Sequence, residues 1–425
     1  MQRGFGLARR FAFGLAGEGM QSAFHFLVNL ALMRMLPASE YGLFAIVFTL
    51  GSLALTYASA LVATPAAILI PRCRGRMTAD LHDVVLGSAA LVLSLAACLL
   101  VALGLGAWSG DAPLAISAGL FVGLWALRSY VRAALYARRD PARVAGSDLA
   151  FAATGLVLGV AAMLPNIGDA GRLAAAFGAL AGANLAGIAA ALAGSGRRLR
   201  VSARRAIWRR YVRHWGMLSW SLVGVTTSNV QSQFQTFLVA ALAGPAAFAP
   251  IAAVTILLAP LRLAVGALIS MVQPDFAAAL SEGRIERART LLAGSLGLVV
   301  AACLGYGAAL WLGFDLLCAH LFGANFAGEP MGLITCLAWA IAAGYLSYML
   351  PKALIEAAGG FRLVATATFA SAVVGIVCVS ALLLVTGPAW SLAGVLAAES
   401  VTLICFWTQV SRILGHSSRI ALSAA

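Results

Sequence analysis

About twelve apolar runs, each long enough to cross a bilayer as a helix, follow one another along the chain and constrain its fold most strongly. A membrane-spanning helix needs ~20 mostly apolar residues. The runs lie roughly at 11–36, 41–63, 84–108, 113–136, 145–165, 172–193, 215–241, 247–273, 290–313, 330–350, 363–386 and 389–410. They leave only short connections in a chain of 425 residues, so no soluble domain fits between them. The sequence predicts an all-α polytopic membrane protein with about 12 transmembrane helices.

The composition excludes the main alternatives to a helical membrane protein. Hydrophobic residues make up 62% of the chain and charged residues 10%, whereas a soluble domain carries ~45–50% and ~25%. A disordered chain would be poor in apolar residues, and an outer-membrane barrel would show short alternating segments in place of long runs. The seven cysteines are scattered without a Cys-x-x-Cys pair. They predict neither a disulfide framework nor a metal site, and we expect no cofactor.

The basic residues test the number and direction of the spans. The chain has 29 Lys and Arg against 15 Asp and Glu, a formal charge of +14. If the N-terminus is cytoplasmic, all but Arg34, Arg172 and Arg262 fall at cytoplasmic ends or loops. The positive-inside rule predicts this bias. We therefore expect both termini in the cytoplasm, and we interpret the basic excess as a sign of topology and not of nucleic-acid binding.

A basic segment in the middle of the chain divides it into two halves. Aromatic and apolar residues recur there at helical spacing, namely Trp208, Tyr211, Val212 and Trp215. The arginines around them are Arg197, Arg198, Arg200, Arg204, Arg205, Arg209, Arg210 and Arg213. This pattern is typical of a helix on a membrane surface, and we expect anionic membrane lipids as partners. The predicted domains are a six-helix bundle at 1–194, a cytoplasmic basic amphipathic linker at 195–214 and a second six-helix bundle at 215–425.

Several stretches resemble the polysaccharide (O-antigen and exopolysaccharide) flippases of the multidrug/oligosaccharidyl-lipid/polysaccharide exporter superfamily. The resemblance rests on RMLPASEYGLFA at 34–45, QPDF and SEGR at 273–284, EAAGGFR at 356–362 and WSLAGV at 390–395. In addition, the polar stretch at 21–28 is similar to that at 231–239, as expected of an internal duplication. Leu36 departs from the family, which usually has glycine before the proline.

The resemblance implies a function as well as a fold. It implies a flippase of the bacterial inner membrane that moves a polyprenyl-diphosphate-linked oligosaccharide by alternating access for lipopolysaccharide or exopolysaccharide biosynthesis. A polysaccharide polymerase and glycosyltransferases would then be functional partners. Such a protein is a transporter and not an enzyme.

Polar residues inside the first predicted span form one stripe. At 100° per residue, Glu18, Gln21, Ser22, His25 and Asn29 lie within about 60° of one line. Lipid cannot satisfy such groups, so they should face protein or water. We predict that Glu18 and His25 couple transport to H⁺ or Na⁺. The alternative is that the stripe makes hydrogen bonds between helices.

Arginines inside spans are candidates for binding a phosphate group. Arg128 and Arg132 are four residues apart in the fourth run, and Arg262 lies near the middle of the eighth. Arginine suits bidentate phosphate recognition. For Arg128 and Arg132 the alternative is that they extend toward the interface. Glu399, in the last run, is a predicted coupling residue and a potential ion-pair partner of Arg262.

The seventh run carries uncharged donors and acceptors on one face. Asn229, Gln233 and Thr236 lie there with Thr226 and Ser232. We predict that they bind sugar hydroxyls; the alternative is helix packing.

Other functions remain open at the level of the sequence. A drug/cation antiporter of the same superfamily should bind cations, against which an arginine-bearing interior argues. A membrane glycan polymerase or ligase should present a large outer loop with catalytic residues, but the outer loops are short. A scaffold for a synthesis complex would need none of the polar interior. The chain contains no Walker A motif and no sequence cluster of serine, histidine and acid.

Overall fold

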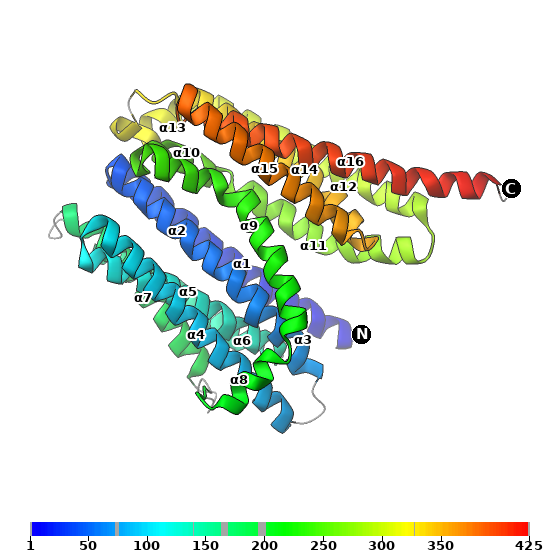
Figure 1. Ribbon diagram of the computed structural model, residues 1–425, viewed down its shortest axis with the longest axis horizontal. Coiled ribbons are helices and arrows are strands. Elements are labelled where there is room, and N and C mark those ends of the chain that lie inside the picture. Colours follow the sequence, from blue (N-terminus) through cyan, green and yellow to red (C-terminus); the bar gives the residue numbers. More distant parts are fainter. Residues whose placement is uncertain are drawn as a thin grey trace. The chain divides into compact units, whose positions relative to one another are not determined.

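The computed structural model describes residues 2–72, 76–138, 140–162, 169–193, 201–326 and 328–423 (Figure 1). These residues are almost entirely helical and contain no strand, which confirms the predicted all-α fold class. The first half contains α1 (Gln2–Met35), α2 (Ala38–Ala58), η1 (Ser59–Ala63), α3 (Thr64–Arg72), α4 (Arg76–Ser109), α5 (Ala112–Ala137), α6 (Pro141–Ala162), α7 (Asp169–Leu192) and α8 (Arg205–Val212). The second half contains α9 (Trp215–Ala243), α10 (Pro245–Leu257), α11 (Ala259–Ser281), α12 (Ile285–Leu312), α13 (Phe314–Leu317), η2 (Cys318–Phe322), η3 (Gly323–Phe326), α14 (Met331–Ala357), α15 (Phe361–Val385) and α16 (Ser391–Ser423).

The helices correspond to the predicted membrane spans. Within the described residues, 9 helices are long and apolar enough to cross a membrane. α10 and the first part of α11, which are bent by 45° where they meet, pass the same test together, so the count rises to 10 if this pair forms one span. The predicted run 247–273 is therefore broken at Leu258. The first and seventh runs lie on the long helices α1 and α9. The structure accordingly fits about 12 transmembrane helices.

The chain divides into two compact units. Unit 1 contains Met1–Asn29 and Phe44–Thr226, and unit 2 contains Leu30–Leu43 and Thr227–Ala425. The C-terminal end of α1, the turn after it and the start of α2 thus belong to unit 2. The predicted domain boundaries at 194 and 215 stay predictions.

Unit 1 is built around α5, which packs against α3, α4 and α7, while α6 packs against α7. Small residues allow the close approach of α5 to α4. A Cβ on Gly119 would lie 2.5 Å from the carbonyl oxygen of Cys98, and one on Gly123 would lie 2.7 Å from that of Ser94. Small residues serve the same purpose at helix interfaces in other membrane proteins. The buried core of this unit includes Val62, Ile70, Leu86, Tyr130 and Val144.

Unit 2 is built around α14, which packs against α11, α12 and α16, while α15 packs against α16. Its buried core includes Val265, Phe276, Leu350, Leu354 and Phe406. The turn between α1 and α2 is held in this unit by the amide of Asn325, which donates to the carbonyl of Leu36 at 3.0 Å. Gly42 lies so close to the backbone of Pro245 that no larger residue fits there.

A π-helical turn, η1, joins α2 to α3, so the predicted run 41–63 continues as helix to Arg72. This turn leaves two backbone carbonyls without their α-helical donors. The N–H of Thr64 bonds to Ser59, not to Ala60, and Pro65 has no N–H to offer to Leu61. The hydroxyl of Ser221 donates to the carbonyl of Ala60 at 3.3 Å, and that of Tyr211 donates to the carbonyl of Leu61 at 3.2 Å.

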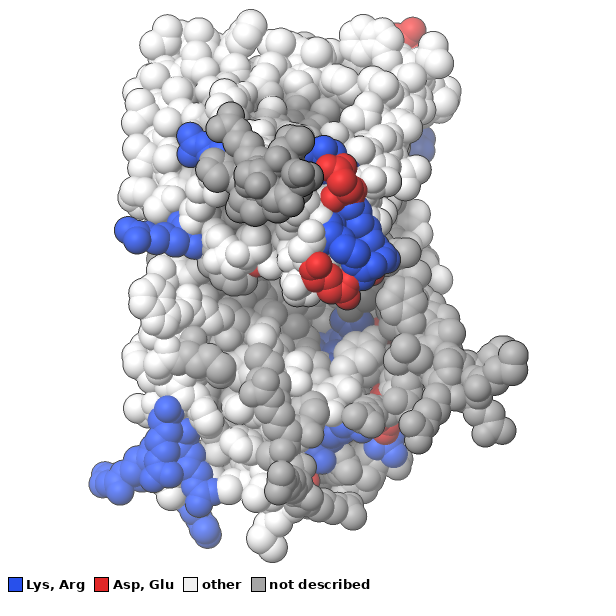
Figure 2. Space-filling model, turned by 90° about the vertical axis from the view of Figure 1, so that its right-hand side faces the viewer, with Lys and Arg blue, Asp and Glu red and all other residues white. Residues whose placement is uncertain are grey.

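The turn between α11 and α12, one of those that the sequence predicts to be cytoplasmic, carries basic side chains. The turn contains Arg284, which pairs with Glu282. Near the start of α12, Arg289 pairs with Glu286 at 2.8 Å. Figure 2 shows Lys and Arg side chains, with Asp and Glu among them, on the face that contains this turn. This arrangement agrees with the alternation of basic loops in the sequence.

Candidate functional site

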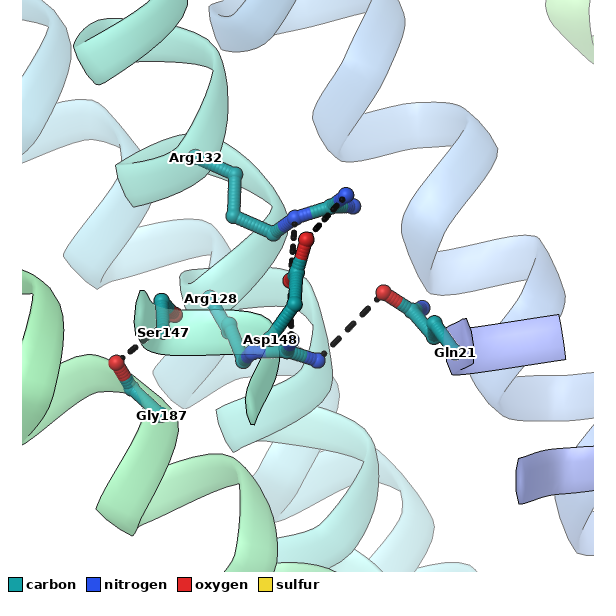
Figure 3. Close-up of polar contacts among 6 residues, drawn as sticks. All are labelled: Gln21, Arg128, Arg132, Ser147, Asp148 and Gly187. Atoms are coloured by element: carbon teal, nitrogen blue, oxygen red, sulfur yellow. Dashed lines mark hydrogen bonds and ion pairs between the residues drawn. The ribbon is translucent and has the colours of Figure 1, made fainter. Parts of the chain in front are cut away.

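A buried cluster of one carboxylate and two guanidinium groups lies in the interior of unit 1 (Figure 3). Nη2 of Arg128 lies 2.6 Å from Oδ1 of Asp148, and Nε of Arg132 lies 3.0 Å from the same oxygen. Nη2 of Arg132 also donates to Oδ2 of Asp148 at 3.2 Å. Both arginines are on α5, one turn apart, and Asp148 is on α6. The three side chains, which we call the Asp148 cluster, therefore join two helices.

Neighbouring groups hold the Asp148 cluster in place. Nη1 of Arg128 contacts Oε1 of Gln21 on α1 at 3.4 Å, and its Cζ lies 4.0 Å from the centre of the Phe151 ring. On α7, Gly187 leaves space for Arg128, because a Cβ there would lie 2.6 Å from Nε of the arginine. The carbonyl of Gly187 accepts a hydrogen bond from Ser147 at 2.8 Å. Helices α1, α5, α6 and α7 thus all contribute to one polar site.

Arg128 and Arg132 were predicted site residues from the sequence, whereas Asp148 was not. The available signal was a carboxylate four residues into the fifth apolar run, where a charge is costly unless it is paired. Arg128 is only 1% exposed and Arg132 only 8% exposed. Their predicted role in binding substrate phosphate stays a prediction. Such binding would require the substrate anion to compete with Asp148 for the two guanidinium groups.

His25 lies near this cluster in an aromatic environment. Its ring centroid is 5.0 Å from that of Trp125, 5.3 Å from Phe48 and 5.5 Å from Phe151. Neither ring nitrogen has a hydrogen-bond partner among the described residues. Glu18, the other predicted coupling residue on α1, has a side chain outside the described part of the structure. Ion coupling through either residue stays a prediction.

In unit 2, two tyrosines lie between Arg262 and Glu399. The Cζ of Arg262 lies 5.9 Å from the centre of the Tyr345 ring. The rings of Tyr345 and Tyr348 are 5.4 Å apart in a T-shaped arrangement. The hydroxyl of Tyr348 donates to Oε2 of Glu399 at 2.5 Å. We call these four side chains the Arg262 cluster. Its two tyrosines were not among the site residues predicted from the sequence.

Arg262 and Glu399 do not form the direct ion pair that the sequence analysis considered, because no contact within 4.0 Å joins them. Glu399 is 9% exposed, whereas Arg262 is exposed and stands in the first turn of α11, directly after the bend. No acidic side chain among the described residues pairs with Arg262. A cation inside a membrane span must face water, protein or a ligand and not lipid.

The polar residues of α9 separate into two groups. Gln231 donates to Ser371 and Thr402 at 3.3 and 3.2 Å, and Gln235 donates to Ser391 at 3.1 Å. These two glutamines therefore bind α9 to α15 and α16, which is a role in helix packing. The predicted sugar-binding residues lie elsewhere on the helix: Asn229 and Thr236 are buried, and Gln233 is half-buried. Arg128 and Arg132 belong to unit 1, whereas these three residues belong to unit 2.

The described residues contain no group of three or more His, Cys, Asp or Glu side chains that could hold a metal ion. The guanidinium, carboxylate and phenol groups of the two clusters offer electrostatic binding of ions and hydrogen bonding.

Comparison with known proteins identifies the fold. No family model matches the chain, and no curated protein matches it. Among solved structures, a multidrug resistance MATE family transporter of the MOP superfamily in an inward-facing conformation matches with a TM-score of 0.71 at 15% identity, over 94% of this chain and 96% of the other. An outward-facing structure of a transporter of the same description matches with a TM-score of 0.58 at 16% identity, over 97% and 96%.

A third structure comes from Pyrococcus furiosus. It is a MOP superfamily transporter for which a reversed polarity of the binding pocket suggests a different function, and it matches with a TM-score of 0.58 at 14% identity, over 97% of this chain and 96% of the other. At these identities the match shows the fold and not the substrate. The chain thus has the helical fold of the MATE transporters of the MOP superfamily, over nearly its whole length.

Proposed function

We propose that the chain is a flippase that carries a polyprenyl-diphosphate-linked oligosaccharide across the bacterial inner membrane by alternating access. The fold supports transport, since structures with the same fold are described as inward-facing and outward-facing transporters. The short resemblances at 34–45, 273–284, 356–362 and 390–395 support the polysaccharide substrate. The distribution of basic residues supports cytoplasmic termini.

One observation carries the substrate class: Arg262 is an exposed arginine in a membrane span with no carboxylate paired to it. A guanidinium group offers several donors in one plane and matches the oxygens of a phosphate. The ring of Tyr345 supports the guanidinium on one side by a cation–π contact and leaves its donors for a ligand. In this proposal the diphosphate of the lipid carrier binds Arg262.

The sugar part of the substrate needs uncharged donors and acceptors. In this proposal Asn229, Gln233 and Thr236 on α9 supply these groups. Gln231 and Gln235 on the same helix form hydrogen bonds to α15 and α16. Arg128 and Arg132 act on the substrate anion only in a state in which Asp148 yields part of its contacts. Glu18, His25 and Glu399 are the proposed sites of coupling to H⁺ or Na⁺.

The second candidate function is drug/cation antiport, which the multidrug transporters among the fold neighbours favour. The two functions require opposite electrostatics at the binding site. An organic cation would have to bind near Arg262, whose guanidinium already faces the ring of Tyr345. This arrangement favours an anionic substrate.

The test is complementation in a bacterial strain that lacks its own flippase for the lipid-linked oligosaccharide. We expect the wild-type chain to restore polymer export and Arg262→Ala to abolish most of it at equal protein level. Arg412→Ala is the matched control, because Arg412 is also an exposed arginine and lies near one end of the candidate span Ser391–Gly415 in α16. Arg262→Lys keeps the charge but loses the planar fork, so we expect partial export.

Drug susceptibility of the same strain is measured in parallel. Drug resistance conferred by the wild-type chain, without polymer export, would establish the antiporter and overturn the flippase. Export that is normal in Arg262→Ala would remove Arg262 from the binding site. Gene neighbours that encode glycosyltransferases and a polymerase would support the flippase independently.

A further inference from the structure

The short helix α8 presents a dense group of arginines on the outside of unit 1. All of these side chains are exposed: Arg204, Arg205, Arg209, Arg210 and Arg213. We call them the α8 arginine surface. None of them forms an ion pair within 4.0 Å among the described residues, unlike Arg284 and Arg289 at the α11–α12 turn. The surface therefore presents concentrated positive charge without a counter-charge from the described protein.

The opposite face of α8 is fixed to the body of unit 1. Trp208 and Tyr211 are half-buried, pack against the buried core of this unit and contact each other with ring centroids 6.2 Å apart. The hydroxyl of Tyr211 binds the Leu61 carbonyl at the π-helical turn, and the backbone N–H of Ser202 binds the hydroxyl of Ser88 on α4 at 2.9 Å. Since both contacts are to helices in candidate membrane spans, the backbone of α8 is held against unit 1.

The position of α8 in the chain places it at the bilayer surface. It lies between α7, a candidate span that ends at Leu192, and α9, which begins at Trp215. Exposed apolar groups accompany the arginines, since Val212 is 60% exposed and Trp215 is 49% exposed. Arginines next to exposed aromatic and aliphatic side chains are the composition of a segment in the headgroup region.

We propose that the α8 arginine surface binds the headgroup phosphates of anionic phospholipids in the membrane that the chain spans. Guanidinium groups form charge-assisted hydrogen bonds to phosphate oxygens. Val212 and Trp215 enter the apolar boundary below the headgroups. We assign lipid as the ligand because it supplies both anionic phosphates for the arginines and, next to them, apolar chains for Val212 and Trp215. An acidic protein segment would match only the charges.

The test compares two double variants of the full-length protein. The first, Arg209→Gln with Arg210→Gln, removes two unpaired arginines of α8. The matched control, Arg284→Gln with Arg289→Gln, removes two arginines that already have acidic partners. Each protein is reconstituted into nanodiscs made of equal parts of phosphatidylcholine and phosphatidylglycerol. Native mass spectrometry then counts the phosphatidylglycerol molecules that stay bound when the protein is released.

We expect wild type to retain phosphatidylglycerol in preference to phosphatidylcholine. Each basic residue near an anionic surface contributes ~1 kcal/mol, so the α8 variant should bind phosphatidylglycerol about 25-fold more weakly. The control variant should retain it like wild type. Higher salt should weaken retention in wild type, because exposed charges are screened.

Equal phosphatidylglycerol retention in wild type and the α8 variant would overturn the proposal. Equal retention of phosphatidylglycerol and phosphatidylcholine by wild type would also overturn it. In that case an acidic protein partner becomes the alternative ligand of the α8 arginine surface. Arg209→Lys with Arg210→Lys keeps the charge and guards against misfolding of the glutamine variant. It should retain more phosphatidylglycerol than the glutamine variant, and no gain on restoring the charge would also contradict the proposal. Because neither pair touches the Arg262 cluster, the outcome is independent of the substrate proposed above.

Discussion

Arg128 on α5 and Asp148 on α6 form an ion pair of 2.6 Å in which the arginine side chain is 1% exposed and the aspartate side chain is not exposed at all. Arg132 contacts the same carboxylate from the next turn of α5. Removing one partner of a buried pair leaves an uncompensated charge that water cannot solvate. The interior of unit 1 therefore depends on Asp148 for stability, whatever else the site does.

Asp148→Asn removes the carboxylate charge that both arginines contact. We expect it to lower the free energy of unfolding by about 3–5 kcal/mol, measured by denaturant or thermal unfolding in detergent. Asp140→Asn is the control, because Asp140 pairs with Arg143 at 3.1 Å where both side chains are about one-third exposed. Such a surface pair contributes at most about 1 kcal/mol. Equal losses from the two variants would contradict a stabilising role of the Asp148 cluster.

Gly187→Ala tests the packing around Arg128. The new Cβ would lie 2.6 Å from Nε of Arg128 and 3.2 Å from the carbonyl oxygen of Ser147, so the arginine must shift. Overpacking of this kind costs ~1–3 kcal/mol, and we expect a lower melting temperature. Gly178→Ala on the same helix meets nothing within 4 Å and should be neutral or stabilising, because alanine favours helix. If Gly187→Ala also proved neutral, Arg128 would not be held as described.

Tyr211→Phe removes the hydroxyl that binds α8 to the π-helical turn. A hydrogen bond of this kind contributes ~0.5–1.5 kcal/mol, so trypsin should cleave after the α8 arginines about 2–10 times faster. Cleavage after Arg284 and Arg287 in the same molecules gives the internal control and should not change. Burial raises the pKa of Tyr211 above its ordinary value, so the neutral hydroxyl is favoured in the folded state. The docking it provides is therefore complete below the ordinary tyrosine pKa and weakens at higher pH.

Ion coupling is testable in vesicles that contain the purified protein and its lipid-linked substrate. If Glu399 takes part, Glu399→Gln should make the transport rate insensitive to an imposed pH or sodium gradient, while Tyr348 keeps a hydrogen-bond partner. The control is Glu329→Gln, since Glu329 is an exposed loop residue. Wild-type transport that ignores both gradients would remove Glu18, His25 and Glu399 from the mechanism together.

The fold was predictable to a large extent because membrane helices are specified locally. The apolar runs mark helices, and the alternation of basic loops orders them, without any knowledge of their packing. The bend at Leu258 and the π-helical turn before Pro65 were missed, since both occur within continuous apolar runs. Hydropathy does not distinguish a straight helix from a bent one.

The candidate site was predictable only by residue type. Because charged residues are rare inside apolar runs, Arg128, Arg132, Arg262 and Glu399 were predicted as site residues. Which of them are paired depends on side chains that are distant in sequence or on another helix. Asp148 neutralises charge on α5 from α6, and Tyr348 on α14 binds Glu399 on α16.

The sequence by itself predicted an all-helical membrane protein with basic residues concentrated on one side of the membrane. This was possible because the insertion of each segment into the bilayer depends on its own apolar length and on the charges next to it. Only the tertiary structure decided which rare charges are compensated. Helix packing buries Arg128 against Asp148 and leaves Arg262 exposed beside Tyr345. The energy of a charge in a membrane depends on the groups within a few ångströms of it, and those neighbours are set by contacts between helices.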